Sequence, residues 1–384
     1  MPYLFTGNDR HTLGVEIELQ LVDAETLALT NSIQPFLESV PEHWQPFFKP
    51  EFMQSYCEIN TAVCESVKDV ERDLTAKLQW ANDEAARMGL RLLWSGAHPF
   101  SRWEEQHISP GDRYAWLMET MQYVARRLVV FGLHVHVGVD SGDKAIQMCD
   151  RLLRHLPTLL ALSANSPMWC GRDTGMESYR SKIMEALPTA GLPPMLRNWS
   201  EYVWLIDHLA ETGFIQSIRE IWWDVRPHAS FGTVEIRIMD QPLCMRHLLG
   251  LVALTQSLVA GISEDIDKGA YLYDSHPMIA KQNKWHAARW GMDASFVDFD
   301  TMSAVPARQV ARRLIERCRI HAERLGCLEE LGYLDDILRN GTGADRQRRV
   351  LRESGQMGDV VRYLLEQSSG SGTAEPVDER SLQS

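Results

Sequence analysis

The chain has 384 residues and a formal net charge of −13 at pH 7, with 45% hydrophobic and 24% charged residues. This composition is typical of a globular protein with a sizeable core, and the acidic balance argues against a general nucleic-acid binder, which would carry a basic face. The seven cysteines form no CxxC pair, which favours reduced thiols in a cytoplasmic protein. The first residues lack a basic region followed by an apolar run, so we expect no signal peptide. The most apolar run, 248–262, is too short to span a membrane and is expected to be a core helix.

The first predicted element is a strand over residues 14–22, in which apolar and polar residues alternate strictly. Glu16 and Glu18 share its polar face, about 7 Å apart along the strand. An exposed strand face would explain them without any function. Two neighbouring carboxylates nevertheless cost free energy unless a cation lies between them, and a divalent metal ion is the simplest such cation.

Residues 51–61 contribute further carboxylates next to this strand. Tyr56–Thr61 has the pattern of a short strand that carries Glu58, and Glu51 precedes it. Ser66 can cap a helix over 67–88, which Gly89 ends. A short apolar strand follows over 91–95, and then a helix over 112–131.

A second alternating strand is predicted over residues 133–140, with His134 and His136 on its polar face. A solvated strand face is one interpretation, and a zinc site of the His-x-His type is another. Zinc would need a third tight ligand, and no cysteine stands at a suitable spacing.

A helix is expected over 144–164, followed by an irregular segment over 165–198 that carries Arg180 and is rich in glycine and proline. Long loops in compact domains are usually functional or disordered. After a helix over 201–211, a third alternating strand over 233–240 places Glu235 and Arg237 on one face. An ion pair on the strand is the simplest explanation of that couple. Helices are then predicted over 243–262, 305–325, 328–339 and 344–366, and a disordered tail over 368–384.

The three alternating strands can form one antiparallel sheet, giving an α+β fold in which helices cover the apolar faces. The other faces would then form a floor of carboxylates, imidazoles and a guanidinium. Carboxylates with an occasional imidazole suit Mg²⁺ or Mn²⁺, and arginines grip phosphate oxygens. This combination indicates a site for a nucleoside triphosphate and its transferring phosphoryl group. The sequence contains neither a Walker A motif nor GxGxxG, so the phosphates would be held by metals on a sheet.

Six motifs carry a resemblance to a known family: TLGVEIELQLVD (12–23), EINTAVCE (58–65), GLHVHVGV (132–139), GRDTGMESYRSKI (171–183), LPTAGLP (187–193) and WWDVRPHASFGTVEIRIMD (222–240). Together they resemble the carboxylate–amine ligases of the type 2 glutamate–cysteine ligase family, from Thr12 to about Tyr363. The resemblance implies a glutamine synthetase-like catalytic fold, a curved antiparallel sheet with helices on its convex face and the site on its concave face. It implies a single catalytic domain over residues 1–367.

The resemblance also implies roles for individual residues. The metal ligands would be Glu16, Glu18, Glu51, Glu58, His134 and Glu235. His134 could alternatively bind the ATP phosphates, with His136 beside it. Arg237 would bind phosphate, Arg226 would hold the substrate carboxylate or stabilise the transferring phosphoryl group, and Arg180 would cover the site from a mobile segment.

The implied reaction is ATP-dependent amide formation with Mg²⁺ or Mn²⁺. A carboxylate, with glutamate as the expected substrate, would become an acyl phosphate, and an amine, such as that of cysteine, would displace phosphate. The resemblance further implies a homo-oligomer. A metal-dependent zinc hydrolase built on the His-x-His strand is the alternative that the residues leave open.

Overall fold

A computed structural model describes residues 4–270 and 276–368 of the chain. Its centre is a seven-stranded antiparallel sheet in the order β2-β3-β1-β5-β9-β8, with β4 paired to β1 as well. The strands of this sheet are β1 (Leu13–Asp23), β2 (Phe48–Pro50), β3 (Tyr56–Asn60), β4 (Leu90–Leu93), β5 (Gly132–Gly138), β8 (Val225–His228) and β9 (Thr233–Asp240). The predicted antiparallel sheet and its three alternating strands are confirmed.

β1 is a central strand that pairs with β3 and with β5. Its two faces lie in different environments. Val15, Ile17 and Leu19 are at most 1% exposed and belong to the main hydrophobic core. Glu16 and Glu18 point to the opposite face, because successive side chains of a strand alternate. Each buried aliphatic side chain contributes about 1.5–3 kcal/mol to folding. This gain determines that the apolar face of β1 lies against the core and the polar face against the site.

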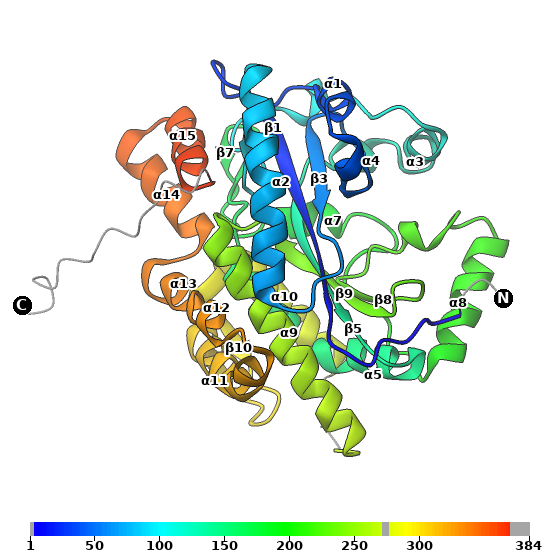
Figure 1. Cartoon of the computed structure of the whole chain (residues 1–384). Coiled ribbons are helices and arrows are strands. Elements are labelled where there is room, and N and C mark those ends of the chain that lie inside the picture. Colours follow the sequence, from blue (N-terminus) through cyan, green and yellow to red (C-terminus); the bar gives the residue numbers. More distant parts are fainter. Residues whose placement is uncertain (1–3, 271–275, 369–384) are drawn as a thin grey trace, which may run out of the picture.

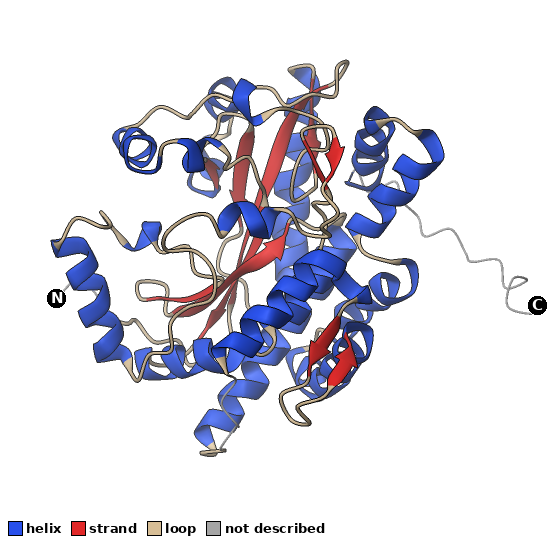
Figure 2. Ribbon diagram, turned by 180° about the vertical axis from the view of Figure 1, so that it is seen from behind, coloured by secondary structure: helices blue, strands red, loops and turns tan. Residues whose placement is uncertain are grey.

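Helices cover the apolar face of the sheet. Figure 1 is seen from this side, and α2 and α9 run across the front of the strands. Figure 2 shows the opposite face, where loops and short helices surround the strands. The helices that contact the sheet on the covered side are α2 (Val67–Arg87), α5 (Gly142–Leu152), α6 (Leu156–Ser163) and α9 (Met245–Asp267). The opposite face of the sheet is therefore left open for a site.

α9 is the one helix in the described part of the chain that is long and apolar enough to cross a membrane. It has 23 residues, more than the expected 243–262 run, and 83% of its most apolar window is buried inside the fold. The predicted core helix is therefore confirmed, although the expectation that its length falls short of a membrane span was wrong.

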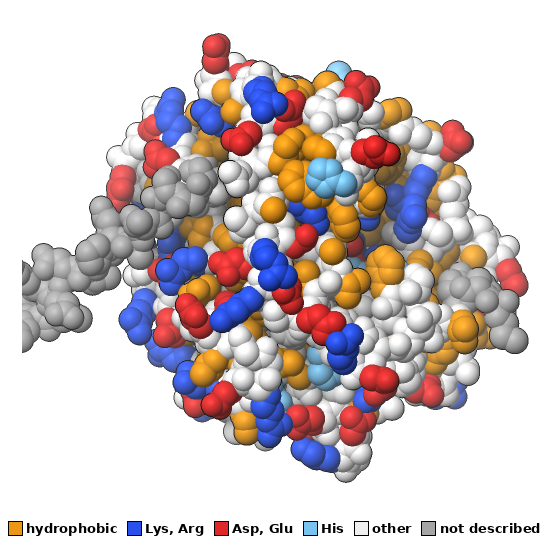
Figure 3. All heavy atoms as spheres, in the orientation of Figure 1, with side chains coloured by type: hydrophobic (Ala, Val, Ile, Leu, Met, Phe, Trp, Pro, Cys, Tyr) orange, Lys and Arg blue, Asp and Glu red, His pale blue; other side chains and the backbone are white. Residues whose placement is uncertain are grey.

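The remaining helices lie around the sheet and extend the core toward the C-terminal half. They are α1 (Ile33–Glu38), α3 (Asp112–Met121), α4 (Tyr123–Arg126), α7 (Arg180–Met184), α8 (Trp199–Glu211), α10 (Pro277–Trp290), α11 (Ala307–Leu325), α12 (Leu328–Gly332), α13 (Leu334–Asn340), α14 (Gly343–Ser354) and α15 (Met357–Ser368). Two small ribbons complete the fold: β6 (Met168–Trp169) with β7 (Arg172–Asp173), and β10 (Ser295–Val297) with β11 (Ala304–Pro306). On the surface in Figure 3, acidic and basic side chains are interspersed.

Several predicted helices are divided in the structure. The helix expected over 112–131 breaks at Gln122, whose φ of 48° is not helical, and ends at Arg126. The helix over 144–164 is interrupted before Pro157, because proline is favoured in the first turn of a new helix. The helix over 344–366 breaks at Gly355, which takes the left-handed conformation that ends α14.

The predicted division into a domain over 1–367 and a tail over 368–384 stays a prediction. Ser368 is the last residue of α15. Residues 369–384 lie outside the described part of the chain.

Candidate active site

The sheet register brings the predicted polar residues together on the open face. Glu16 on β1 lies opposite His134 on β5, and Glu18 lies opposite Glu58 on β3. On the other side of β5, His136 lies opposite Glu235 on β9. A cavity of about 350 Å³ is lined by Glu16, Glu18, Glu58 and His134. His136 lies beside Glu16 and Glu235, outside this lining. Four strands thus contribute to one floor.

A β-bulge in β9 shapes this floor beside His134. The pairing of β5 with β9 shifts between Leu133 and Val135, so that Arg237 and Ile238 together face His134. Bulges bend a strand and re-aim side chains. Arg237 lines the cavity from this position and forms an ion pair with Glu235.

The first carboxylate group consists of Glu16, His136 and Glu235, whose candidate ligand atoms all lie within 4.8 Å of one another. His136 Nε2 is 3.4 Å from Glu16 Oε1 and 3.9 Å from Glu235 Oε1. His136 Nδ1 is 3.0 Å from the Thr233 hydroxyl oxygen. Nε2 is buried and has no hydrogen-bond partner within the described residues. Burial alone lowers the pKa of His136, but the charges of Glu235 and Glu16 raise it. A cation that replaces this proton would meet Nε2 between two carboxylates, with Nδ1 held by Thr233, as in metal-binding histidines.

Charges around this first group keep its carboxylates ionised. Burial by itself raises the pKa of Glu235, but Arg226 and Arg237 bring it well below its usual value. Burial likewise raises the pKa of Glu16, yet the neighbouring imidazoles of His134 and His136 lower it well below the usual value. Two ionised carboxylates and one imidazole nitrogen are a donor set suited to a divalent cation.

The second carboxylate group consists of Glu18, Glu51 and Glu58, whose nearest oxygens also lie within 4.8 Å of one another. Burial and the charge of Glu58 raise the pKa of Glu18 to about 7, against the opposing effect of Arg180. Burial and the neighbouring carboxylates raise the pKa of Glu51 well above its usual value. Carboxylates packed in this way hold protons unless a cation replaces them. The group therefore fits a hard divalent metal ion.

The structure assigns the two histidines different surroundings. His134 lies outside both carboxylate groups, with Nδ1 3.1 Å from Glu16 Oε2 and 3.5 Å from Arg237 Nη1. Burial and Arg237 lower its pKa to about 4. The geometry thus favours His136 over the expected His134 as a metal ligand. The two rings do not converge on a common point, and neither group contains a described cysteine, which speaks against the zinc site.

Arg226 holds Glu235 in place and also lines the cavity. Its Nε is 2.6 Å and its Nη2 is 3.3 Å from the Glu235 carboxylate. Its Nη1 donates to the backbone oxygens of Ile218 and Ile221, at 3.0 and 2.8 Å. All three guanidinium nitrogens are engaged, which gives Arg226 a positioning role toward Glu235. Its expected contact with the substrate carboxylate or the transferring phosphoryl group stays a prediction.

Arg180 is buried beside Glu18 and β9 and does not form a cover over the site. It is buried at the start of α7, and it donates to the backbone oxygens of Arg237 and Ile238 at 3.2 and 3.3 Å. Its guanidinium packs against Gly132, where a Cβ atom would stand only 2.1 Å from Nη2. Gly132 also donates its backbone N–H to Glu18. The expected mobile cover is thus replaced by a fixed charge next to the second carboxylate group.

Other cavity residues carried no clear signal in the sequence. Cationic side chains are contributed by Lys49 on β2 and by Arg113 and Arg219. Arg113 Nε is 2.9 Å from the buried carboxylate of Glu220. Trp222, which is partly buried against a core cluster, also lines the cavity. Single basic residues such as these follow no repeating pattern in the sequence, so their position in the cavity could not be predicted.

Comparisons with known proteins agree with one another. The model of glutamate–cysteine ligase family 2 matches residues 12–366. A protein of Thermobifida fusca provisionally named glutamate–cysteine ligase 2 is 42% identical over 367 residues, covering 94% of this chain and 92% of its own. A relative in Rubrobacter xylanophilus, provisionally named glutamate–cysteine ligase 2-1, is 43% identical over 379 residues, covering 98% and 100%.

Solved structures share the fold at low sequence identity. The glutamate–cysteine ligase of Francisella tularensis in complex with AMP has a TM-score of 0.70 at 15% identity, covering 94% of this chain and 90% of its own. A bifunctional glutathione synthetase of Pasteurella multocida has a TM-score of 0.71 at 14% identity, with 94% of this chain and 52% of that chain covered. These similarities give no support to the hydrolase alternative.

Proposed function

The chain belongs to glutamate–cysteine ligase family 2, a family of ATP-dependent ligases that form carbon–nitrogen bonds, and we propose that it joins glutamate to a small amine with two divalent cations at the site. The observation that carries the proposal is that β1 contributes one glutamate to each of the two carboxylate groups. Glu16 belongs to one group and Glu18 to the other, two residues or about 7 Å apart along the strand, so one strand contributes to both candidate cation sites.

The residues fit Mg²⁺ or Mn²⁺ at both groups. Glu16, His136 and Glu235 would hold one cation, and Glu18, Glu51 and Glu58 the other. Cations bound there would neutralise phosphate charge and orient the γ-phosphoryl group. Two observations support cation binding: the buried Nε2 of His136 lies between two carboxylates without a hydrogen-bond partner among the described residues, and the pKa values of Glu18 and Glu51 are raised.

Arginines would supply the remaining charge compensation. Arg237 faces the cavity and would contact the transferring phosphoryl group, while Arg226 holds Glu235 in place. Arg180, fixed beside Glu18, would add a second charge at the same wall. Preorganised charges of this kind stabilise the developing transition state without reorganising.

The reaction balances with two displacements. A carboxylate oxygen of glutamate attacks the γ-phosphorus of ATP, and ADP leaves with the electron pair of the broken P–O bond. The amine nitrogen then attacks the acyl carbon of the resulting acyl phosphate, phosphate leaves, and the nitrogen loses a proton. Lys49, Arg113 and Arg219 line the same cavity and are suited to hold the substrate carboxylates.

A phosphate- and ADP-release screen tests this proposal. Purified protein is given ATP, Mg²⁺ or Mn²⁺, glutamate, and a panel of amines that includes cysteine. We expect ADP release only when a carboxylate, an amine and the divalent ion are all present. Glu235→Gln should lower the rate at least 100-fold, whereas Glu25→Gln, an exposed carboxylate beyond the end of β1, should leave it unchanged. No turnover with any amine, or equal rates in the two variants, would refute the proposal.

We also propose a cytoplasmic location and a homo-oligomer. All seven cysteines are free thiols in the structure, and five of them are buried, as expected for a reducing compartment. Light scattering after size-exclusion chromatography tests the oligomer: a mass of 43.8 kDa would contradict it.

A further inference from the structure

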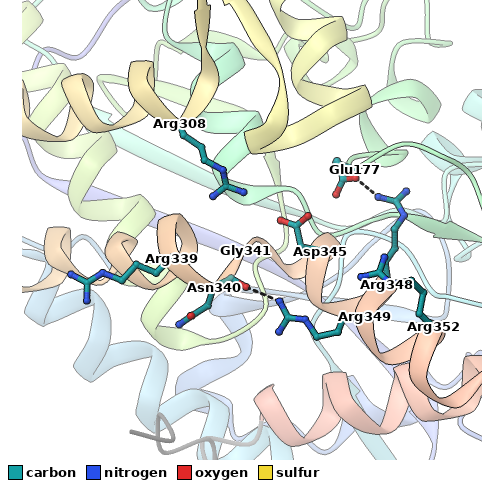
Figure 4. Close-up of a pocket in the computed structure, with 9 residues that line it drawn as sticks. All are labelled: Glu177, Arg308, Arg339, Asn340, Gly341, Asp345, Arg348, Arg349 and Arg352. Carbon is teal, nitrogen blue, oxygen red and sulfur yellow. Dashed lines mark hydrogen bonds and ion pairs between the residues drawn. The ribbon is translucent and has the colours of Figure 1, made fainter. Parts of the chain in front are cut away.

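A second cavity of about 350 Å³ lies outside the catalytic cavity and shares no residue with it. It lies where the loop between α13 and α14 meets α11 and the segment after β7 (Figure 4). Its lining is Glu177, Arg308, Arg339, Asn340, Gly341, Asp345, Arg348, Arg349 and Arg352. Five arginines therefore face two carboxylates, in a chain whose net charge is −13.

Two of these arginines are held in place by hydrogen bonds to neighbouring residues. Arg348 is held by both oxygens of Asp173, each at 2.9 Å, by Met176 O at 2.8 Å, and by an ion pair with Glu177. Arg308 donates to Asp293 at 3.0 and 3.2 Å and to Leu338 O at 3.0 Å. Guanidinium groups fixed in this way are preorganised, so little side-chain entropy is lost when they meet an anion.

Of the other three arginines, two have no carboxylate partner among the described residues. Within residues 4–270 and 276–368, Arg352 has no carboxylate partner, and Arg349 donates only to Asn340 O, at 3.2 Å. Arg339 forms an ion pair with Asp335 at 3.7 Å, and both side chains are mostly exposed, so that pair contributes little. Figure 4 shows the guanidinium groups of Arg308 and Arg349 on opposite sides of Asp345.

Acidic residues offset the charges of Arg308, Arg339 and Arg348. The cations that keep free donors are Arg349 and Arg352, and one further carboxylate, that of Asp345, lies beside them. Asp345 Oδ2 already accepts hydrogen bonds from the N–H and hydroxyl of Thr342, at 2.8 and 3.0 Å, where it caps α14. Glu177 is occupied by Arg348. No apolar side chain lines the cavity, so a ligand would be held there by charge and hydrogen bonds.

We propose that this arginine cavity binds an oligophosphate anion, two or more linked phosphates, at a site separate from catalysis. Several guanidinium groups around one small cavity can grip the oxygens of adjacent phosphates bidentately. The cavity volume is at the lower end of the range for small-molecule sites, which suits a compact polyanion. Binding does not depend on ligase turnover, so this inference and the proposed function can fail separately.

Calorimetric titration of the full-length protein with sodium pyrophosphate tests the proposal. EDTA is included so that no divalent ion carries pyrophosphate to the catalytic carboxylates. We expect one pyrophosphate per chain, with weaker binding as the salt concentration rises. Inorganic phosphate should bind more weakly, tripolyphosphate more tightly, and citrate at least tenfold more weakly than pyrophosphate. Absence of binding, or citrate binding as tight as that of pyrophosphate, would overturn the proposal.

Variants locate the site. R349A/R352A should weaken pyrophosphate binding at least tenfold. The control R87A/R324A also removes two exposed arginines, from α2 and α11, and should bind as the wild type does. Amide hydrogen exchange should show pyrophosphate-dependent protection within residues 339–352. Equal affinity in all three proteins, or protection confined to the strands of the catalytic floor, would refute the assignment.

Discussion

Glu18→Gln should stabilise the metal-free protein and weaken its response to metal. Burial and the charge of Glu58 raise the pKa of Glu18 from 4.5 to about 7 despite the opposing charge of Arg180. A group with a raised carboxyl pKa destabilises the fold as pH rises from 4.5 through 7, since the folded state must then release its proton. Above pH 7 this difference corresponds to about 3 kcal/mol. A glutamine oxygen can still accept from the N–H of Gly132.

Urea unfolding in EDTA measures this effect. At pH 8 the free energy of unfolding of Glu18→Gln should exceed that of the wild type by up to about 3 kcal/mol, and the difference should vanish near pH 4.5. Mn²⁺ at 100 times its dissociation constant should stabilise the wild type by about 2.7 kcal/mol for each site that it fills, and the variant should lose the contribution of the second group. Glu25→Gln is the matched control and should behave as the wild type does under both conditions.

The reasoning would be refuted by either of two results. Glu18→Gln could be no more stable than the wild type at pH 8 in EDTA, in which case the three carboxylates do not repel one another as described. Alternatively, Mn²⁺ could stabilise both proteins equally, in which case Glu18 is not part of a cation site.

Three further predictions concern single residues around the site and the core. Thr233→Val removes the hydroxyl that contacts His136 Nδ1 and should weaken Mn²⁺ binding about 10- to 100-fold by calorimetry; unchanged affinity would contradict the assigned role. Gly132→Ala places a methyl group 2.1 Å from Arg180 Nη2 and should lower kcat and the free energy of unfolding, the latter by about 1–3 kcal/mol; wild-type values of both would show that the packing is loose. Burial lowers the pKa of His98 to about 3, so stability is lost as pH falls from 6.5 toward 3. His98→Asn should therefore reduce the difference in unfolding free energy between pH 7 and pH 5 by about 2 kcal/mol, and an unchanged difference would exclude this residue as its source.

The sequence predicted the floor of the site because strand alternation is a strong signal. Glu16 and Glu18 on β1 alternate with side chains that are at most 1% exposed, and His136 and Glu235 follow the same rule on their strands. Strict alternation along a strand determines on which face of the sheet each side chain lies. It does not fix the register, so sequence could not decide which histidine approaches Glu235, and the family resemblance favoured His134 where the geometry favours His136.

Elements without periodicity escaped prediction. β8 (Val225–His228) has four residues and includes Pro227, and β2 has only three residues, too few to show alternation. No helix was predicted where α10 (Pro277–Trp290) lies, because its apolar and polar residues have no clear helical period. Arg180 was expected on a mobile cover because glycine and proline surround it in the chain. Its burial depends on contacts with β5 and β9, which only tertiary structure provides.

Isotope transfer tests the proposed chemistry most directly. Glutamate, or whichever carboxylate supports ADP release in the screen, is labelled with ¹⁸O in its carboxylates and incubated with ATP, the divalent ion and the amine. If an acyl phosphate forms, the phosphate that the amine displaces must carry one oxygen from the carboxylate, so we expect one ¹⁸O in each phosphate released. Unlabelled phosphate would mean that water attacks ATP directly, and it would contradict amide formation through an activated carboxylate at this site.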